Sequence, residues 1–142
     1  MLTDARIEFK NVDFWYNHNE DQILNKINIV FEGGKMTSLV GHSGSGKSTL
    51  IDVIAGLLEP GSGDFYYRGR FFSPIVQWWR DRVGYVAQDV QLIEGSIKEN
   101  ILLGNEDVTD EEFQKAAEIS GLDIFVEQTG YGYDLEVGEN GK

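Results

Sequence analysis

Residues 41–49 read Gly-His-Ser-Gly-Ser-Gly-Lys-Ser-Thr and decide the fold, because they match the phosphate-loop pattern Gly-x-x-x-x-Gly-Lys-Ser/Thr in full. A short apolar run precedes the pattern and apolar positions at helical spacing follow it, so it lies between a predicted strand and a predicted helix. Glycines let the backbone wrap until successive N–H groups point inward, and the helix N-terminus adds about half a positive charge. We therefore predict a polyphosphate cradle formed by Gly41, His42, Ser43, Gly44, Ser45, Gly46, Lys47, Ser48 and Thr49.

Three side chains of this loop suit a nucleoside triphosphate with Mg²⁺. Lys47 is placed to reach the β and γ phosphates, and the Ser48 hydroxyl to ligate the metal. Thr49 is expected nearer the α and β phosphates, whereas His42 is expected to point its side chain away from them and receives no chemical role. A turn that only joins a strand to a helix would not explain a lysine followed by two hydroxyl residues at this place.

Before the loop, the sequence predicts antiparallel strands. Apolar residues alternate through residues 6–16 with a shift of phase around Asn11, which indicates a strand pair or a bulged strand. Residues 23–31 repeat the alternation, and the two glycines at 33–34 supply a turn. Two antiparallel strands are expected here.

The segments around and after the loop add strands and helices. Residues 36–40 are apolar without alternation, as in a strand buried on both faces, and residues 47–58 have helical spacing. We predict a further strand over 64–67, a short helix or turn over 75–82, and a second buried strand over 83–86.

The C-terminal part is predicted to be helical and acidic. Thr109 followed by Glu112 forms a capping box that opens a helix which Gly121 can close, and a short helix is expected over 123–128. We therefore expect an ATP-binding core part over residues 1–104 and an incomplete acidic helical subdomain over residues 105–142.

Charge and composition exclude several classes of function. The net charge is −12, and residues 105–142 alone contain eleven acidic residues against two lysines. An acidic chain repels phosphate backbones at long range, so no nucleic-acid partner is expected. The chain has no cysteine, which rules out disulfides and thiolate metal sites, and no apolar run approaches the ~18–20 residues that span a bilayer.

Three further segments accompany the loop. Residues 12–16 read Val-Asp-Phe-Trp-Tyr, residues 83–89 read Val-Gly-Tyr-Val-Ala-Gln-Asp, and residues 92–101 read Leu-Ile-Glu-Gly-Ser-Ile-Lys-Glu-Asn-Ile. Together they make the chain resemble, from about residue 6 to its end, the nucleotide-binding domain of an ATP-binding cassette (ABC) transporter, most like the exporter-type branch. The resemblance implies the N-terminal part of an α/β P-loop NTPase domain of ABC type: an antiparallel β-subdomain, the phosphate-loop strand and helix, and the start of the helical subdomain.

The resemblance also implies roles for single residues. Tyr16 matches the aromatic residue that stacks on adenine, although Trp15 could take that role instead, and Ile23 offers an apolar edge to the base. Gln88 matches the glutamine that ligates Mg²⁺ or positions the attacking water. A rival interpretation treats residues 83–89 as a strand ending in an Mg²⁺-binding acid, and Ile93 stands where the family usually has Phe.

Residues 133–141 resemble the stretch that immediately precedes the family's signature sequence. The signature, the Walker B aspartate, the catalytic glutamate and the γ-phosphate-sensing histidine are therefore expected after Lys142. We expect this chain to bind ATP and Mg²⁺ but to lack the hydrolysis machinery, whereas the intact domain would be an ABC-type ATPase.

The partners implied are a transmembrane domain and a second nucleotide-binding domain in a head-to-tail dimer, which would place the chain at the cytoplasmic face of a membrane. Two other functions remain open. A non-catalytic module would use ATP occupancy to change its grip on another protein. A P-loop kinase would need an acceptor site and an arginine-rich lid, for which Arg80 and Arg82 are the only nearby pair.

Overall fold

The computed structural model describes residues 5–17, 21–105 and 107–138, and it divides into two compact units. The first unit is Met1–Tyr85 and the second is Val86–Lys142. The boundary expected from the sequence lies after residue 104, so residues 86–104 group here with the second unit. The boundary between functional domains stays a prediction.

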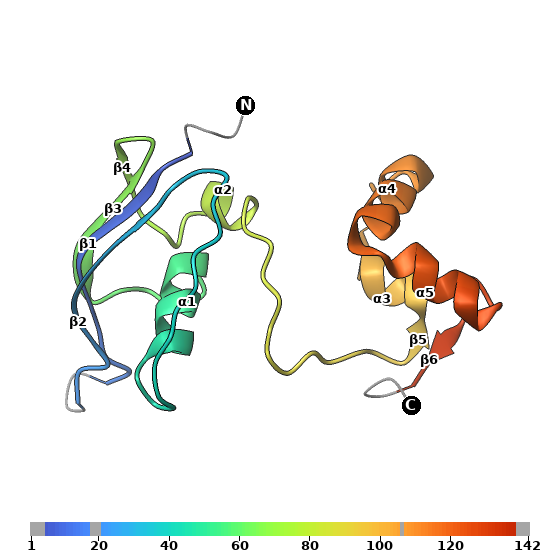
Figure 1. The fold of residues 1–142 in the computed structure, drawn as a ribbon, viewed down its shortest axis with the longest axis horizontal. Helices are drawn as coiled ribbons and strands as arrows, with labels where there is room; N and C mark the ends of the chain where they lie inside the picture. Colours follow the sequence, from blue (N-terminus) through green and yellow to red (C-terminus); the bar gives the residue numbers. More distant parts are fainter. Residues whose placement is uncertain (1–4, 18–20, 106, 139–142) are drawn as a thin grey trace. The chain divides into compact units, whose positions relative to one another are not determined.

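The first unit is built on a four-stranded antiparallel sheet in the order β2-β1-β3-β4 (Figure 1). Its strands are β1 (Ile7–Phe14), β2 (Leu24–Phe31), β3 (Ser62–Tyr67) and β4 (Arg70–Phe72). The strands predicted over residues 6–16, 23–31 and 64–67 are thereby confirmed, whereas the short strand β4 was not predicted.

A bulge interrupts β1 where the sequence shifts its phase. The register between β1 and β2 shifts between Phe9 and Val12, and Asn11 has a positive φ of 49°. Asparagine tolerates this left-handed conformation better than most residues, which explains its place in the bulge. The prediction of a bulged strand is confirmed, and the bulge returns Phe9 and Val12 to the same buried core.

Helix α1 (Lys47–Ala55) contributes Leu50 and Val53 to the core that the sheet forms. The helix ends earlier than predicted, because Gly56 adopts a left-handed conformation (φ 76°) and caps it. Helix α2 (Gln77–Arg80) lies within the predicted range 75–82 and adds a buried tryptophan. The buried core comprises Phe9, Val12, Phe14, Leu24, Leu50, Val53, Phe65, Phe72 and Trp79.

Two predicted strands are not present. Residues 36–40 and 83–86 have no strand structure, and Met36, Val40 and Val86 are 96%, 90% and 88% exposed. A strand buried on both faces needs a hydrogen-bonded neighbour at its edges and layers above and below. Within the described part of the chain, neither segment pairs with a strand; Leu39 and Val83 pack against the core, whereas Met36, Val40 and Val86 stay exposed.

The second unit is mostly helical, as predicted. It contains β5 (Gly95–Ser96), α3 (Ile97–Leu102), α4 (Asp110–Ser120), α5 (Leu122–Thr129) and β6 (Glu136–Val137). β5 and β6 pair as a two-stranded antiparallel ribbon that was not predicted.

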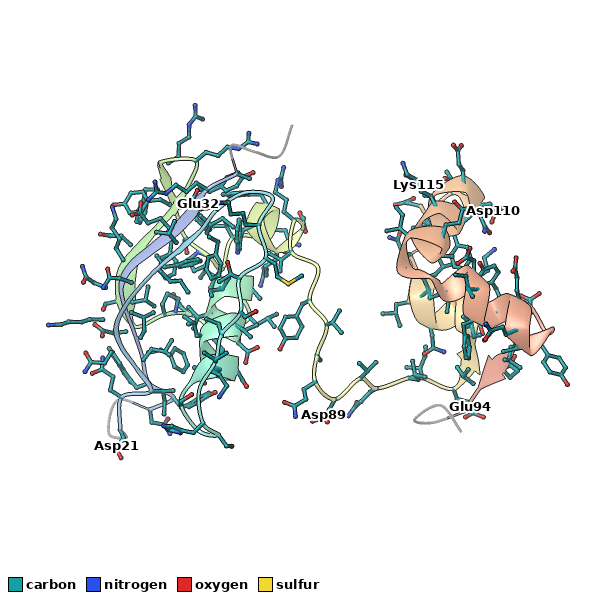
Figure 2. All side chains as sticks on the ribbon, viewed as in Figure 1. Asp21, Glu32, Asp89, Glu94, Asp110 and Lys115 are labelled. Carbon is teal, nitrogen blue, oxygen red and sulfur yellow. The ribbon has the colours of Figure 1, made fainter. Side chains whose placement is uncertain are left out.

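Both ends of α4 confirm the sequence prediction. The Thr109 hydroxyl and the Glu112 side chain form a capping box, and Gly121 closes the helix with a φ of 75°. Figure 2 shows Asp110 and Lys115 projecting from this helix. None of the helices in the described ranges is long and apolar enough to cross a bilayer.

Candidate nucleotide-binding site

The side chain of Lys47 folds back into the phosphate loop. Its ammonium donates hydrogen bonds to the carbonyl oxygens of Gly41 (2.9 Å) and His42 (2.6 Å) and to the Ser45 hydroxyl (3.2 Å). The loop therefore curves around a positive charge, with three loop oxygens bound to the ammonium. A phosphate oxygen can replace these neutral acceptors, because bonds between charged groups are roughly twice as strong.

Backbone N–H groups of the loop and of the first turn of α1 are also available to a ligand. Gly44 and Gly46 have φ values of 77° and 82°, a conformation that favours glycine. At the end of the loop, the Leu50 N–H donates a helical hydrogen bond to the Gly46 carbonyl (2.8 Å). The N–H groups of Lys47, Ser48 and Thr49 thus precede any intrahelical partner and donate to no acceptor in the described ranges. Such groups at a helix N-terminus are suited to an anion.

A hollow of about 340 Å³ adjoins the loop, within the size range of small-molecule sites. One side is formed by the loop and α1, and the other by the start of β2. Its lining residues are Ile23, Leu24, Ile27, Leu39, Val40, Gly41, His42, Ser45, Gly46, Lys47 and Leu50. The structure thus places Ile23 beside the residues predicted to hold phosphate.

Tyr16 contacts helix α1, which follows the phosphate loop. Its hydroxyl is 3.3 Å from the hydroxyl of Thr49, which is buried in the first turn of α1. The ring packs edge-on against Phe14 with centroids 5.0 Å apart, yet the side chain is 57% exposed. A ring that is held at one edge and open to solvent can stack on a flat base.

The remaining loop residues have local roles. The ring nitrogen Nδ1 of His42 is 2.9 Å from the Ser43 carbonyl, and the Ser45 N–H donates to the His42 carbonyl (3.3 Å). These contacts keep the loop's shape, and the His42 side chain is exposed. Ser48 is exposed as well, so its hydroxyl is accessible to a metal–phosphate complex.

Gln88 lies in the second unit, on the irregular segment that also carries Asp89 (Figure 2). Its side chain is exposed. Ser48 belongs to the first unit, and the role of Gln88 in holding Mg²⁺ or water stays a prediction. The rival interpretation, a strand ending in an acid, has no support because residues 83–86 form no strand.

The donor set fits a magnesium–polyphosphate complex. The loop and the first turn of α1 offer one ammonium, three helix N–H groups and a hydroxyl, and all are donors or neutral oxygen ligands. In the described residues no group of three or more His, Cys, Asp or Glu side chains could hold a metal by itself. Mg²⁺ bound here would take most of its ligands from phosphate and water, which is its usual preference.

Comparison with known proteins identifies the family of the chain. The family described as ABC transporter matches residues 24–140, which is most of the chain. The chain belongs to the ABC transporter family.

Individual relatives extend the likeness to the residues before the family match. A Sinorhizobium fredii protein described as an uncharacterised ABC transporter ATP-binding protein is 42% identical over 138 residues, covering 96% of this chain and 23% of the relative. A Staphylococcus aureus protein, provisionally named a multidrug export ATP-binding/permease protein, is 40% identical over 141 residues, or 99% of this chain and 24% of its own length.

A solved structure shares the fold. A bacterial Atm1-family ABC exporter with ATP bound superposes with a TM-score of 0.81 at 30% identity, covering 99% of this chain and 25% of that one. The chain thus spans about a quarter of the length of these relatives. The predicted ABC-type P-loop fold is confirmed.

Sequence reasoning missed some polar contacts that shape this ABC domain. The Asp13 carboxylate accepts hydrogen bonds from three residues, including the Ser62 hydroxyl (2.8 Å). The Tyr85 hydroxyl donates to the Asp52 carboxylate (2.8 Å), which raises the pKa of Tyr85 above its usual value. Each pair joins residues far apart in the sequence, so no local pattern signals it.

Proposed function

We propose that this chain binds Mg-ATP through residues 41–49. The observation that carries the proposal is the position of the Lys47 ammonium, held inside the loop by oxygens of Gly41, His42 and Ser45. A lysine in this position is ready to exchange those acceptors for the β and γ phosphates. Ser48 would ligate Mg²⁺, and the helix N–H groups would bind phosphate oxygens.

We further propose that Tyr16 and Ile23 bind the adenine base. Tyr16 is supported by its exposed ring and by its contact with Thr49, and Ile23 by its place in the lining of the hollow. Stacking on an aromatic ring contributes about 1–3 kcal/mol per base and distinguishes little beyond a flat ring. The base would therefore add affinity while the phosphates supply most of the recognition.

In the intact protein, the bound ATP would drive transport across a membrane. We propose that the complete domain is an ABC-type ATPase whose Gln88 positions Mg²⁺ or the attacking water. We also propose that a transmembrane domain and a second nucleotide-binding domain are its partners, at the cytoplasmic face of a membrane. The names of the relatives, which combine ATP-binding with permease or export, support this assignment.

For the 142 residues alone, we propose ATP binding without hydrolysis. Phosphoryl transfer needs an oriented water, a metal and charge stabilisation of the transition state. The residues assigned above supply the phosphate cradle and part of the metal shell. Phosphate release by this chain at a rate that Lys47→Ala abolishes would contradict this part of the proposal.

Titration with a fluorescent ATP analogue tests the binding proposal directly. The chain should bind the analogue in the presence of Mg²⁺, and Lys47→Ala should weaken binding at least tenfold. Lys35→Ala is the matched control, since it removes an exposed lysine of the same unit outside the cradle. Equal affinity of the Lys47→Ala and wild-type chains would overturn the proposal.

A further inference from the structure

The carboxylate of Asp13 joins three separate segments of the first unit. Oδ1 accepts hydrogen bonds from the Gln22 amide (2.6 Å) and from the Lys26 backbone N–H (2.7 Å). Oδ2 accepts one from the Ser62 hydroxyl (2.8 Å), at the start of β3. The backbone carbonyl of Asp13 also accepts from the Gly61 N–H (3.0 Å). One residue of β1 thereby fixes parts of β2 and β3 on either side of it.

The bond to Lys26 holds an unusual backbone conformation. Lys26 has a φ of 46°, in the left-handed region that residues with a Cβ adopt at a cost. Its N–H donates to Asp13, and its carbonyl accepts from the Asn28 amide (2.8 Å). Asn28 in turn accepts from the Asn11 N–H in the β1 bulge (3.1 Å). The conformation persists because these bonds determine it from both sides.

The segment that Asp13 holds is a wall of the candidate site. Gln22 immediately precedes Ile23, whose N–H donates to the Phe14 carbonyl (2.9 Å) and whose side chain lines the hollow beside the phosphate loop. Ile23 also approaches the loop closely, because a Cβ on Gly46 would lie 3.2 Å from the Ile23 carbonyl oxygen. The position of Gln22 and Ile23 thus sets the distance between β2 and the cradle.

Asp13 also stabilises the end of β1, which leads to Tyr16, the residue proposed to stack on the base. Asp13 precedes Phe14, and the Phe14 ring supports the edge of Tyr16 at 5.0 Å. Tyr16 and Ile23 therefore project from the two chain segments that the Asp13 carboxylate and the Phe14 carbonyl hold together. The Asp13 side chain itself does not line the hollow.

We infer that Asp13 is a positioning residue that sets the base-binding face, formed by Tyr16 and Ile23, relative to the phosphate loop. This inference rests on the proposed binding of ATP and concerns the nucleoside half of the ligand only. Loss of the carboxylate should loosen contacts to the base while the cradle continues to bind the phosphates. The affinity for a ligand that has phosphates but no base should then be the same with and without the Asp13 carboxylate.

The test compares two ligands, Mg-ATP and magnesium tripolyphosphate, by isothermal titration calorimetry on the full chain. Asp13→Ala should weaken the affinity for ATP at least fivefold and change the affinity for tripolyphosphate less than twofold. Asp13→Asn should restore most of the ATP affinity, because its amide oxygen can still accept from Gln22 and Lys26. Glu8→Ala is the control, since it removes another β1 carboxylate, one that pairs with Arg6 and Lys10.

Ser62→Ala keeps the test decisive if Asp13→Ala does not fold, because it removes a single bond of the network. Ser62→Ala should weaken the affinity for ATP about twofold and leave the affinity for tripolyphosphate unchanged. Equal weakening of both ligands, or no change with either, would overturn the inference while leaving the proposed function in place. Failure of the wild-type chain to bind either ligand would overturn both.

Discussion

The hydroxyl of Tyr16 lies 3.3 Å from the hydroxyl of Thr49, and this contact joins the end of the antiparallel sheet to the first turn of α1. The two residues are 33 positions apart, and each belongs to a different sequence motif. A nucleotide with its phosphates at the helix and its base at the ring would extend along this contact. The relationship predicts how single substitutions in both elements affect binding.

Replacing Tyr16 by Ala should weaken ATP binding about 5- to 150-fold, which corresponds to the ~1–3 kcal/mol of a base stacked on an aromatic ring. Tyr16→Phe keeps the ring and loses only the contact with Thr49, so its affinity should stay within about threefold of wild type. Fluorescence titration with Mg-ATP measures both. Wild-type affinity in Tyr16→Ala would move the stacking role to another residue, of which Trp15 is the first to test.

Gly46→Ala should weaken Mg-ATP binding more than the strain of a positive φ at this position would by itself. The added Cβ would lie 3.2–3.3 Å from the carbonyl oxygen and the side chain of Ile23 and from Leu24, in addition to adopting a φ of 82°. Gly34→Ala is the matched comparison, because its φ is 71° but nothing lies within 4 Å of the added Cβ. We expect loss of Mg-ATP binding in the first variant only, whereas similar behaviour of both would mean that crowding against β2 is unimportant.

Phe9→Ala should destabilise the first unit strongly. Phe9 is 1% exposed and packs edge-on against Phe65 and Phe31, with centroids 4.9 and 6.0 Å apart. Removing a buried phenyl ring typically costs about 3–5 kcal/mol. Urea unfolding followed by tryptophan fluorescence measures the change. The control is Phe71→Ala, where the ring is 66% exposed and the expected loss is below about 1 kcal/mol.

Acidification should remove the capping box of α4. The Thr109 backbone N–H (3.0 Å) and hydroxyl (2.8 Å) donate to the Glu112 carboxylate, which holds its pKa below the usual value of 4.5. Because the folded pKa is the lower one, this contribution is complete above about pH 4.5 and is lost as the pH falls through the folded pKa.

Circular dichroism at 222 nm between pH 7 and pH 2 tests this effect. Glu112→Gln should lose less helicity on acidification than wild type, since a neutral amide can still cap the helix without titrating. Glu118→Gln, on the same helix, serves as control because it removes an exposed carboxylate outside the capping box. An acid transition that is identical in wild type and Glu112→Gln would show that the capping box does not contribute to it.

The phosphate loop, the antiparallel strands and the capped helix α4 could be predicted from the sequence because each has a local pattern. The loop motif is contiguous, the bulge at Asn11 appears as a change of phase, and Thr109 with Glu112 and Gly121 marks both ends of a helix. These features depend on residues that are close in the sequence. The residues proposed to contact phosphate could therefore be named from the loop motif alone.

The remaining features depend on distant partners. The apolar runs at 36–40 and 83–86 favour buried strands, but burial requires neighbouring strands that the described residues do not provide. The contact of Tyr16 with Thr49 and the bonds from Asp13 to Ser62 and Lys26 are set by the fold of the whole first unit. Composition and periodicity contain no information on such pairings.

The run from Met36 to Val40 forms no strand, so the two ends of the phosphate loop are held differently. On its C-terminal side the loop continues into the hydrogen-bonded first turns of α1, whereas on its N-terminal side it joins a segment without strand structure, in which Leu39 packs against the core while Met36 and Val40 are exposed. Backbone amides of that segment should exchange with deuterated solvent almost without protection. Any chain that added a strand along it would stiffen the loop, and by thermodynamic reciprocity a bound polyphosphate would then strengthen that strand pairing.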